Sequence, residues 1–344
     1  MMRPLMLKGH DRSLTQVKFN REGDLLFSVS KGKEASVWYS SNGERLGTFV
    51  GHNGTIWSID IDPETDYAVT GSADFTAKLW KAENGQCIHT WTLESPVKRV
   101  EFSPDGSQVL MVTDQVMGQT GKIKIFDIDH TQNAQPSTPK LEIVNEDGPA
   151  SRFTVAGWSY GAFYILAAHA DGKVSKYDAK TGELLGSTKN QEMLLTDLQF
   201  SPDRTYFIVS SKDKTACLYD VDRLSLLKRY TADVPMNSAC ITPVKEFVIL
   251  GGGQDAREVT TTSLSEGKFE SRFYHKIFEE EIGRVKGHFG PLNYVAVHPK
   301  GTCYASGGED GFVRLHHFHK SYFEFLYDVE KTAQATQQFE IEAK

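Results

Sequence analysis

The chain has 344 residues, a formal net charge of −7, and hydrophobic and aromatic contents of 39% and 11%. This composition is sufficient for a large buried interior, and its acidic balance argues against strong direct nucleic-acid binding, which normally requires a basic surface. The first 20 residues contain no apolar run of signal-peptide length, and no later run approaches a membrane span. We therefore expect a cytoplasmic protein without a membrane partner.

The four cysteines are Cys87, Cys217, Cys240 and Cys303. They stand far apart and form no C-x-x-C pair, which disfavours a disulfide framework and thiol chemistry. We expect them to be small buried hydrophobic residues in a reducing compartment.

Two signatures recur along the chain. Gly9-His10 is repeated as Gly51-His52, 42 residues later, and again as Gly287-His288. In the second signature an aspartate precedes an aromatic residue by six positions, as in Asp74 and Trp80 or Asp213 and Tyr219. A period slightly above forty residues, with Gly-His early and an Asp–Trp pair late, is typical of a β-propeller blade.

One complete repeat shows the strand pattern. Residues 55–61 alternate with a period of two, and further short strands are predicted at 67–71, 77–80 and 87–91. Turn chemistry at Pro63, Asp74 and Asn84-Gly85 separates them. Four antiparallel strands per repeat are what a propeller blade requires.

The turn between the second and third strands aligns seven repeats. Its positions are Gly32, Asp74, Thr120, Asp171, Asp213, Asp255 and Asp310. Wider gaps predict insertions at residues 114–121, 130–140 and 262–281, which we interpret as loops between strands. The last of these is expected between the third and fourth strands of blade 6.

The two ends of the repeat array complement each other. The final repeat, residues 292–318, supplies three strands, and residues 4–8 resemble the fourth-strand segment 282–286. The N-terminal segment is therefore predicted to complete blade 7, which removes an open sheet edge. We expect an all-β fold, a seven-bladed WD-repeat β-propeller over residues 1–320, closed by its N-terminal strand.

Residues 321–344 form a C-terminal extension in this interpretation. The segment 321–327 is rich in aromatic residues and is expected to pack on the side of the propeller. Residues 329–343 are rich in Ala, Gln, Glu and Lys, and the sequence leaves a helix and a frayed tail open.

His52, Ser72, Asp74 and Trp80 stand at positions that form a hydrogen-bonded relay in WD-repeat proteins. Such a buried network is favourable only if every donor and acceptor in it is satisfied. A catalytic Ser-His-Asp triad is disfavoured, because the spacing is that of the repeat and no G-x-S-x-G element accompanies it. Blade 1 has Gly32 in place of the aspartate, so its relay should be incomplete.

Other candidate sites are weak. The run Gly251–Gly253 lacks the lysine of a phosphate-binding loop and is interpreted as close backbone packing near the ring axis. His317 and His319 share one strand face, but no third zinc ligand stands at a known spacing. The sequence offers no credible active site, cofactor site or metal site.

Several segments carry a more specific resemblance. They are residues 7–10, 43–48, 51–60, 70–74, 171–178, 242–256 and 267–293. These segments resemble the family of the i subunit of eukaryotic translation initiation factor 3, in particular its fungal members. The resemblance covers the chain except for the 131–150 loop and about the last fifteen residues.

This resemblance implies a non-enzymatic scaffold that supports preinitiation-complex assembly, mRNA recruitment and scanning. The family binds the C-terminal helical segment of the b subunit and also contacts the g subunit, and it meets the small ribosomal subunit through the complex. Its helix-docking site uses acidic residues of blades 5 and 6, and the matching positions are Asp203 and Asp220.

A physical argument supports these two residues independently. The first-to-second and third-to-fourth connections of a four-stranded blade fall at the same end. Asp203 lies in the former and Asp220 in the latter, so both carboxylates should line one rim of blade 5 and accept charge-assisted hydrogen bonds. The simpler alternative is that both are ordinary turn residues.

Two other functions remain open from the sequence. A WD-repeat signalling scaffold of the kinase-receptor-associated type would share the blades but not the blade 6 insertion. A ubiquitin-ligase substrate receptor would need a Trp-Asp-x-Arg element, which Tyr219–Arg223 imitates poorly.

Overall fold

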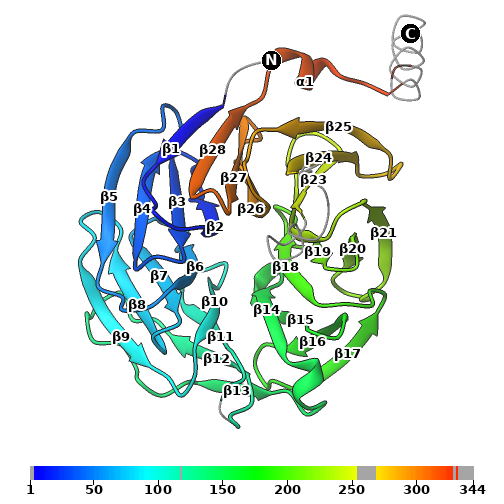
Figure 1. The fold of residues 1–344 in the computed structure, drawn as a ribbon. Helices are drawn as coiled ribbons and strands as arrows, with labels where there is room; N and C mark the ends of the chain where they lie inside the picture. The colour runs from blue at the N-terminus through cyan, green and yellow to red at the C-terminus, as the bar shows by residue number, and fades with distance from the viewer. Residues whose placement is uncertain (1–3, 117, 254–268, 328–330, 332–344) are drawn as a thin grey trace, which may run out of the picture.

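The chain forms a ring of seven four-stranded antiparallel sheets (Figure 1). The computed structural model describes residues 4–116, 118–253, 269–327 and 331. Each sheet is one blade, and its strands follow one another from the axis outward in chain order, except in blade 7. The seven-bladed all-β propeller predicted from the repeats is confirmed.

The first four blades contain strands β2 to β17. Blade 1 contains β2 (Leu14–Phe19), β3 (Leu25–Ser30), β4 (Glu34–Tyr39) and β5 (Arg45–Val50). Blade 2 contains β6 (Ile56–Ile61), β7 (Tyr67–Ser72), β8 (Thr76–Lys81) and β9 (Cys87–Thr92). Blade 3 contains β10 (Val97–Phe102), β11 (Gln108–Thr113), β12 (Lys122–Asp127) and β13 (Leu141–Val144). Blade 4 contains β14 (Phe153–Trp158), β15 (Tyr164–His169), β16 (Lys173–Asp178) and β17 (Leu184–Lys189), with 3₁₀ turns at Pro149–Ser151 and Tyr160–Ala162.

The remaining strands form blades 5 to 7. Blade 5 contains β18 (Leu195–Phe200), β19 (Tyr206–Ser211), β20 (Thr215–Asp220) and β21 (Leu226–Thr231). Blade 6 contains β22 (Met236–Ile241), β23 (Phe247–Gly252), β24 (Glu270–His275) and β25 (Glu281–Lys286). Blade 7 contains β26 (Leu292–Val297), β27 (Cys303–Gly308), β28 (Phe312–His317) and β1 (Leu5–Lys8).

Ring closure occurs through the N-terminal strand, as predicted. β1 pairs antiparallel with β28, with Leu5 opposite Leu315 and Lys8 opposite Phe312. Because the outer strand of blade 7 comes from the start of the chain, backbone hydrogen bonds join the first and last parts of the ring.

The blade 6 insertion lies elsewhere than predicted. The sequence suggested a long connection between the third and fourth strands at residues 262–281, but Glu270–His275 forms the third strand and only residues 276–280 separate it from β25. The long connection is residues 253–269, between the second and third strands. The alternation of apolar and polar residues in β24 is obscured, because Arg272 is buried there in an ion pair with Asp233. The predicted turn residue Asp255 lies outside the described residues.

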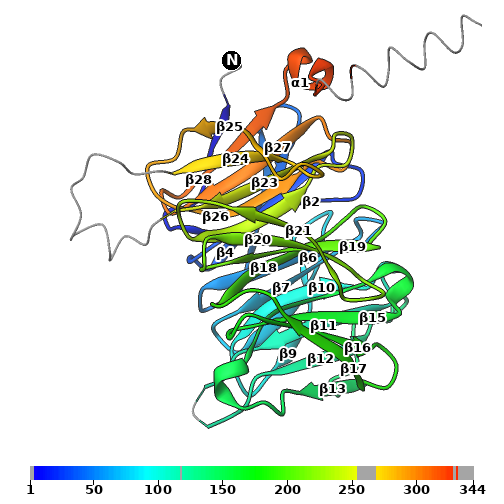
Figure 2. The ribbon, with the colours of Figure 1, turned by 90° about the vertical axis from the view of Figure 1, so that its right-hand side faces the viewer.

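The hydrophobic core is divided among the contacts between neighbouring blades. Phe49 of blade 1 stacks on Trp80 of blade 2 at a centroid distance of 5.5 Å. Leu14 and Leu315 meet in the cluster that joins blades 1 and 7. Figure 2 shows the strands of successive blades lying beside one another around the ring. Stability therefore depends on each blade covering its neighbour.

Glycine permits close packing in blade 6. A Cβ atom added to Gly251 of β23 would lie 2.8 Å from Val295 Cγ1 of blade 7. The interpretation of the Gly251–Gly253 run as a place of close packing is confirmed for this contact.

Three cysteines, Cys217, Cys240 and Cys303, are buried as expected, and Cys87 is exposed. All four are free thiols. The expectation of burial is wrong for Cys87 because it begins β9, an outer strand with one face to solvent.

The first part of the C-terminal extension packs against blades 6 and 7. Helix α1 (Lys320–Glu324) follows β28, and Tyr322 stacks on Phe318 at 3.9 Å. Phe325 and Tyr327 contact Phe247 and His275 of blade 6. The predicted packing of residues 321–327 is confirmed, and the segment 329–343, apart from residue 331, lies outside the described residues. The helices of the described part of the chain are too short to span a bilayer.

Candidate interaction sites on the propeller

The two ends of the ring carry different connections. We call rim 1 the end with the first-to-second and third-to-fourth strand connections of each blade. Rim 2 is the opposite end, with the second-to-third connections and the links between blades. Strands of six residues separate the rims by roughly 20 Å.

The relay of blade 2 lies at rim 2. His52 Nδ1 lies 3.0 Å from Asp74 Oδ2, and His52 Nε2 lies 2.7 Å from Thr70 Oγ1. The indole N–H of Trp80 donates to the same hydroxyl at 2.8 Å. Burial lowers the pKa of His52, so the ring is neutral near pH 7. The bonds then run in one order, from Trp80 through the threonine hydroxyl and the imidazole to the carboxylate.

Thr70 takes the place in this relay that the sequence analysis gave to Ser72. Ser72 Oγ instead accepts the backbone N–H of Asp74 at 3.2 Å and so supports the turn. A spacing signal could have identified the correct residue. A hydroxyl stands 18 residues after the histidine in three blades, as Ser28, Thr70 and Ser306.

Asp74 is saturated with hydrogen bonds. It accepts the backbone N–H groups of Asn53 and Thr76 at 2.8 and 3.0 Å, and the Thr76 hydroxyl at 2.6 Å. Burial opposes its ionisation, but the bonds from Thr76, Asn53 and His52 outweigh burial and hold its pKa well below the ordinary value. Since Thr70 and Trp80 are fully buried, the relay holds the blade together and presents no nucleophile to a substrate.

The relays of blades 1 and 7 are variants of this arrangement. In blade 7, His288 contacts Asp310 at 3.0 Å and Ser306 at 2.8 Å. In blade 1, Ser28 accepts the indole N–H of Trp38 at 2.8 Å and lies 2.7 Å from His10 Nε2. Gly32 supplies no carboxylate there, as expected.

Asp203 and Asp220 both lie at rim 1 of blade 5. Asp203 is in the connection between β18 and β19, and Asp220 ends β20. The two connections touch, because the Val221 N–H donates to the Thr205 carbonyl at 3.0 Å. The structure thus brings the two predicted carboxylates to one rim. The third-to-fourth connection of blade 6 at this rim is only residues 276–280, and not the long loop 262–281 that the sequence predicted.

Local hydrogen bonds orient both carboxylates. Asp203 accepts the hydroxyls of Ser201 at 2.6 Å and Thr205 at 2.9 Å. Partial burial opposes its ionisation, but these bonds lower its pKa. Asp220 accepts the Arg223 backbone N–H at 2.7 Å. Within the described residues neither carboxylate is in an ion pair with a lysine or arginine side chain, so both remain available to an external cation.

Exposed apolar side chains lie along the same rim. Leu226 and Leu227 begin β21 and are 36% and 46% exposed, while Ile277 and Phe278 of blade 6 are 50% and 40% exposed. Blades 5 and 6 touch here, since the Tyr230 hydroxyl donates to the Lys276 carbonyl at 2.7 Å. The blade 5–6 rim surface consists of Asp203, Asp220, Leu226, Leu227, Ile277 and Phe278.

Comparison with known proteins identifies the family. The family model described as EIF3I matches residues 2–328. The chain is 63% identical over 343 residues to eukaryotic translation initiation factor 3 subunit I of Meyerozyma guilliermondii, covering 97% of this chain and 98% of that protein. The chain belongs to the family of eukaryotic translation initiation factor 3 subunit I.

Other members of the subunit I family match over the same extent. The Candida albicans protein is 62% identical over 345 residues, with 97% of this chain and 98% of that protein covered. The Kluyveromyces lactis protein is 58% identical over 347 residues, with 100% and 98% covered. The resemblance found in the sequence is confirmed, and the full-length match favours this family over the two other WD-repeat functions considered.

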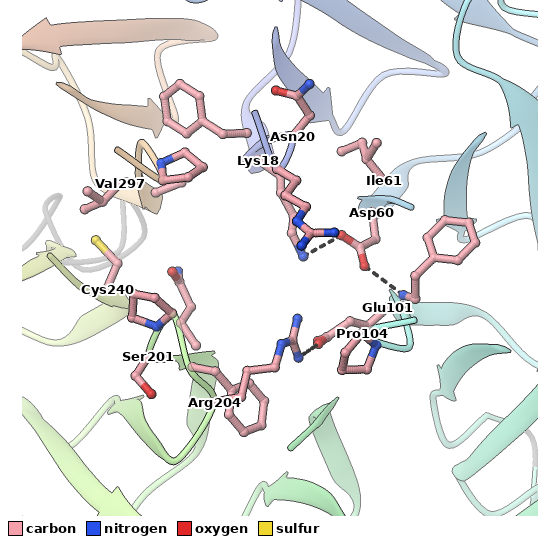
Figure 3. Close-up of a pocket in the computed structure, with 18 of the residues that line it drawn as sticks. Lys18, Asn20, Asp60, Ile61, Glu101, Pro104, Ser201, Arg204, Cys240 and Val297 are labelled. Atoms are coloured by element: carbon pink, nitrogen blue, oxygen red, sulfur yellow. Dashed lines mark hydrogen bonds and ion pairs between the residues drawn. The ribbon is translucent and has the colours of Figure 1, made fainter. Parts of the chain in front are cut away.

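This member of the subunit I family also carries charged side chains on its innermost strands, which the sequence analysis missed. Lys18 of blade 1 pairs with Asp60 of blade 2 at 2.5 Å, and Glu101 of blade 3 pairs at 2.7 Å with Arg204, which lies in the connection between β18 and β19. Figure 3 shows both pairs at the mouth of the central channel. Burial opposes ionisation of Glu101, but the nearby cations outweigh it and lower its pKa.

A third group of charges lies deeper in the channel. Arg99 of blade 3 donates to the Tyr294 hydroxyl of blade 7 at 3.1 Å and lies 3.6 Å from Asp197 of blade 5. Asp197 in turn accepts the hydroxyl of Ser238 of blade 6 at 2.6 Å. Arg99 and Tyr294, together with the charged side chains at the mouth, line a cavity of about 560 Å³. Because opposite charges are matched across blades, we interpret the network as a structural link through the axis.

Proposed function

We propose that the chain is a non-catalytic scaffold subunit of translation initiation factor 3. Its blade 5–6 rim surface binds the C-terminal helical segment of the b subunit, and the propeller also contacts the g subunit. In this role it supports assembly of the 43S preinitiation complex, mRNA recruitment and scanning, and reaches the small ribosomal subunit through the complex. The family match and the relatives' names support membership of the factor.

The observation that supports the docking site is that carboxylates outside any ion pair with lysine or arginine in the described residues lie beside exposed apolar side chains. Asp203 and Asp220 are held in fixed orientations at one rim, next to Leu226 and Leu227. Aliphatic and aromatic side chains of this size supply most of the favourable energy when a helix docks. Carboxylates beside them select a partner with arginine or lysine at the matching positions.

A basic amphipathic helix meets both requirements. Its apolar face covers Leu227 and Phe278, and its cations form charge-assisted hydrogen bonds with the two aspartates. Nearby lysines do not compete strongly, because Lys228 and Lys276 already pair with Glu279 and Glu246. The acidic site therefore complements a positively charged segment.

The test is co-purification of the b subunit with a double charge reversal, Asp203→Lys with Asp220→Lys. We expect the variant to fold but to lose the b subunit, since two attractive contacts become repulsive. The matched control is Asp105→Lys with Asp127→Lys in blade 3. Asp105 accepts hydroxyls of Ser103 and Ser107 in a turn like that of Asp203, and Asp127 ends β12 as Asp220 ends β20.

The control separates docking from turn stability. Loss of the b subunit in the blade 5 variant alone supports the proposal. Undiminished co-purification with the blade 5 variant removes the site assignment, and equal loss in both variants attributes the effect to folding.

A further inference from the structure

A second recessed surface lies between blades 6 and 7. We call it the blade 6–7 groove; it encloses about 400 Å³ where β25, the end of β28 and the C-terminal extension meet. These three elements lie together beside α1 in Figure 1. Six aromatic residues form one part of its wall, namely Phe247, Phe273, Tyr304, Phe318, Tyr322 and Phe325. This volume lies within the range of pockets that hold a small ligand or an anchoring side chain.

The aromatic wall is held by its own contacts. Phe318 lies stacked on Tyr322 at 3.9 Å, and Phe325 packs on Phe247 of β23 at 5.9 Å. Phe273 of β24 meets Tyr304 of blade 7 edge-on at 5.5 Å. Because these rings already pack against one another, a ligand would enter a preformed site and lose less free energy to ordering.

The blade 6–7 groove differs from the blade 5–6 rim surface in its polar side chains. Its described lining includes Arg284, His316, His317 and His319 and contains no aspartate or glutamate. Burial lowers the pKa of His316 to about 3, so that ring is neutral at pH 7. Although Arg284 is bound to Glu281 and Glu270 outside the groove, the imidazoles remain as hydrogen-bond donors for an acceptor such as a carboxylate.

The groove is bordered by a strand edge. β25 is the outermost strand of blade 6, so its outer backbone groups are available to pair with an added segment. Gly283 of β25 lines the groove, and a Cβ atom added there would have no neighbouring atom within 4 Å. An extended chain can therefore approach the backbone closely at this point.

We propose that the blade 6–7 groove binds a short extended peptide of a partner protein. The peptide places a bulky apolar side chain among the aromatic residues and a carboxylate beside the histidines. An apolar anchor next to an acidic residue is the ligand that an aromatic wall with imidazole donors recognises. This site takes acidic peptides, whereas the blade 5–6 rim surface takes basic ones.

The experiment selects ligands from a phage-displayed library of random peptides on the intact protein. A selected peptide is then synthesised, and its affinity is measured by fluorescence anisotropy. We expect enrichment of Phe, Trp, Leu or Ile next to Asp or Glu. Gly283→Trp should weaken binding of the peptide at least about tenfold, because the indole fills open space in the groove without a clash. His317→Glu should weaken it by placing a carboxylate in the wall.

A matched control is Gly47→Trp in blade 1. Gly47 has the same place in β5, directly after the bulge in the pairing of the third and fourth strands, and an added Cβ atom there also meets nothing within 4 Å. Equal melting temperatures of both tryptophan variants would show that folding is unaffected.

Three outcomes with the full-length chain would overturn the proposal. They are a selection without enrichment, selected peptides without acidic residues, and binding that is indifferent to Gly283→Trp. A chain shortened after Tyr327 completes the design. If only the shortened chain binds the peptides, residues after Tyr327 compete for the groove in the full-length chain. The proposal of a partner then fails.

Discussion

Blades 2 and 5 share one frame but differ in which rim carries their distinctive side chains. Each has four strands of six residues. Blade 2 has the complete relay at rim 2, from Trp80 to Asp74. In blade 5 Gln191 replaces the histidine and donates to the Thr215 hydroxyl at 2.9 Å, while rim 1 carries Asp203 and Asp220. The residues that hold a blade together and those proposed to bind a partner therefore lie at opposite ends of the strands, and one set can change without the other.

The largest effect on stability is expected from Asp74→Ala. The change removes the acceptor of His52, of Thr76 and of the Asn53 backbone, and leaves buried donors without partners. Since each such loss costs about 1–3 kcal/mol and the losses overlap, we expect the free energy of unfolding to fall by about 3 kcal/mol. Urea denaturation followed by circular dichroism measures this.

A variant at rim 1 of blade 5 serves as the comparison for the stability of Asp74→Ala. Asp203→Ala removes hydrogen bonds of an exposed turn, where water replaces the lost partners. We expect a decrease of less than about 1 kcal/mol in the free energy of unfolding. Equal losses in the two variants would contradict the division between the rims.

Acid should weaken the incomplete relay of blade 1. Burial, with a smaller effect of Arg45, lowers the pKa of His10 to about 4, from an ordinary value of 6.5. Between these pH values the unfolded chain binds the proton and the folded chain does not, so stability falls as the pH decreases from 6.5 toward 4. From this residue alone we expect a loss of about 2 kcal/mol between pH 7 and pH 5.

His10→Asn isolates that contribution. The free energy of unfolding of the variant should change less between pH 7 and pH 5 than that of the natural protein, by about 2 kcal/mol. The same pH dependence in both proteins would show that His10 is protonated in the folded state.

A gain in stability is expected when the missing carboxylate is supplied to blade 1. Gly32 has the place of Asp74, and its backbone N–H donates to Ser30 at 3.0 Å as that of Asp74 does to Ser72. Gly32→Asp should add an acceptor for His10 and raise the free energy of unfolding by about 1 kcal/mol. A decrease would mean that this turn cannot place a carboxylate near the imidazole.

The repeats predicted much of the fold. The strands of blade 2 agree with the prediction within one residue at each end, and ring closure by residues 5–8 followed from the three-stranded final repeat. The placement of Asp203 and Asp220 followed from blade topology. These features depend on local patterns and on the antiparallel order of strands, which a sequence carries directly.

Features that depend on distant partners were not predictable in this way. The innermost-strand charges would be taken for solvent-facing residues, because Arg99 finds Tyr294 only when the ring closes. β24 falls within the loop 262–281, which was predicted from the wider spacing of the repeats, and its buried Arg272 hides the apolar pattern of a strand. Ser72 was assigned to the relay from its position in WD-repeat proteins, whereas strand register decides that the Thr70 hydroxyl meets His52.

The most direct test of the scaffold function is a charge exchange across the proposed interface, measured by isothermal titration calorimetry. The C-terminal segment of the b subunit should bind Asp203→Lys with Asp220→Lys at least about 100-fold more weakly than it binds the natural protein. The same segment with its basic residues changed to glutamate should bind the double variant more tightly than it binds the natural protein. Equal affinity of the natural segment for both proteins would contradict the account.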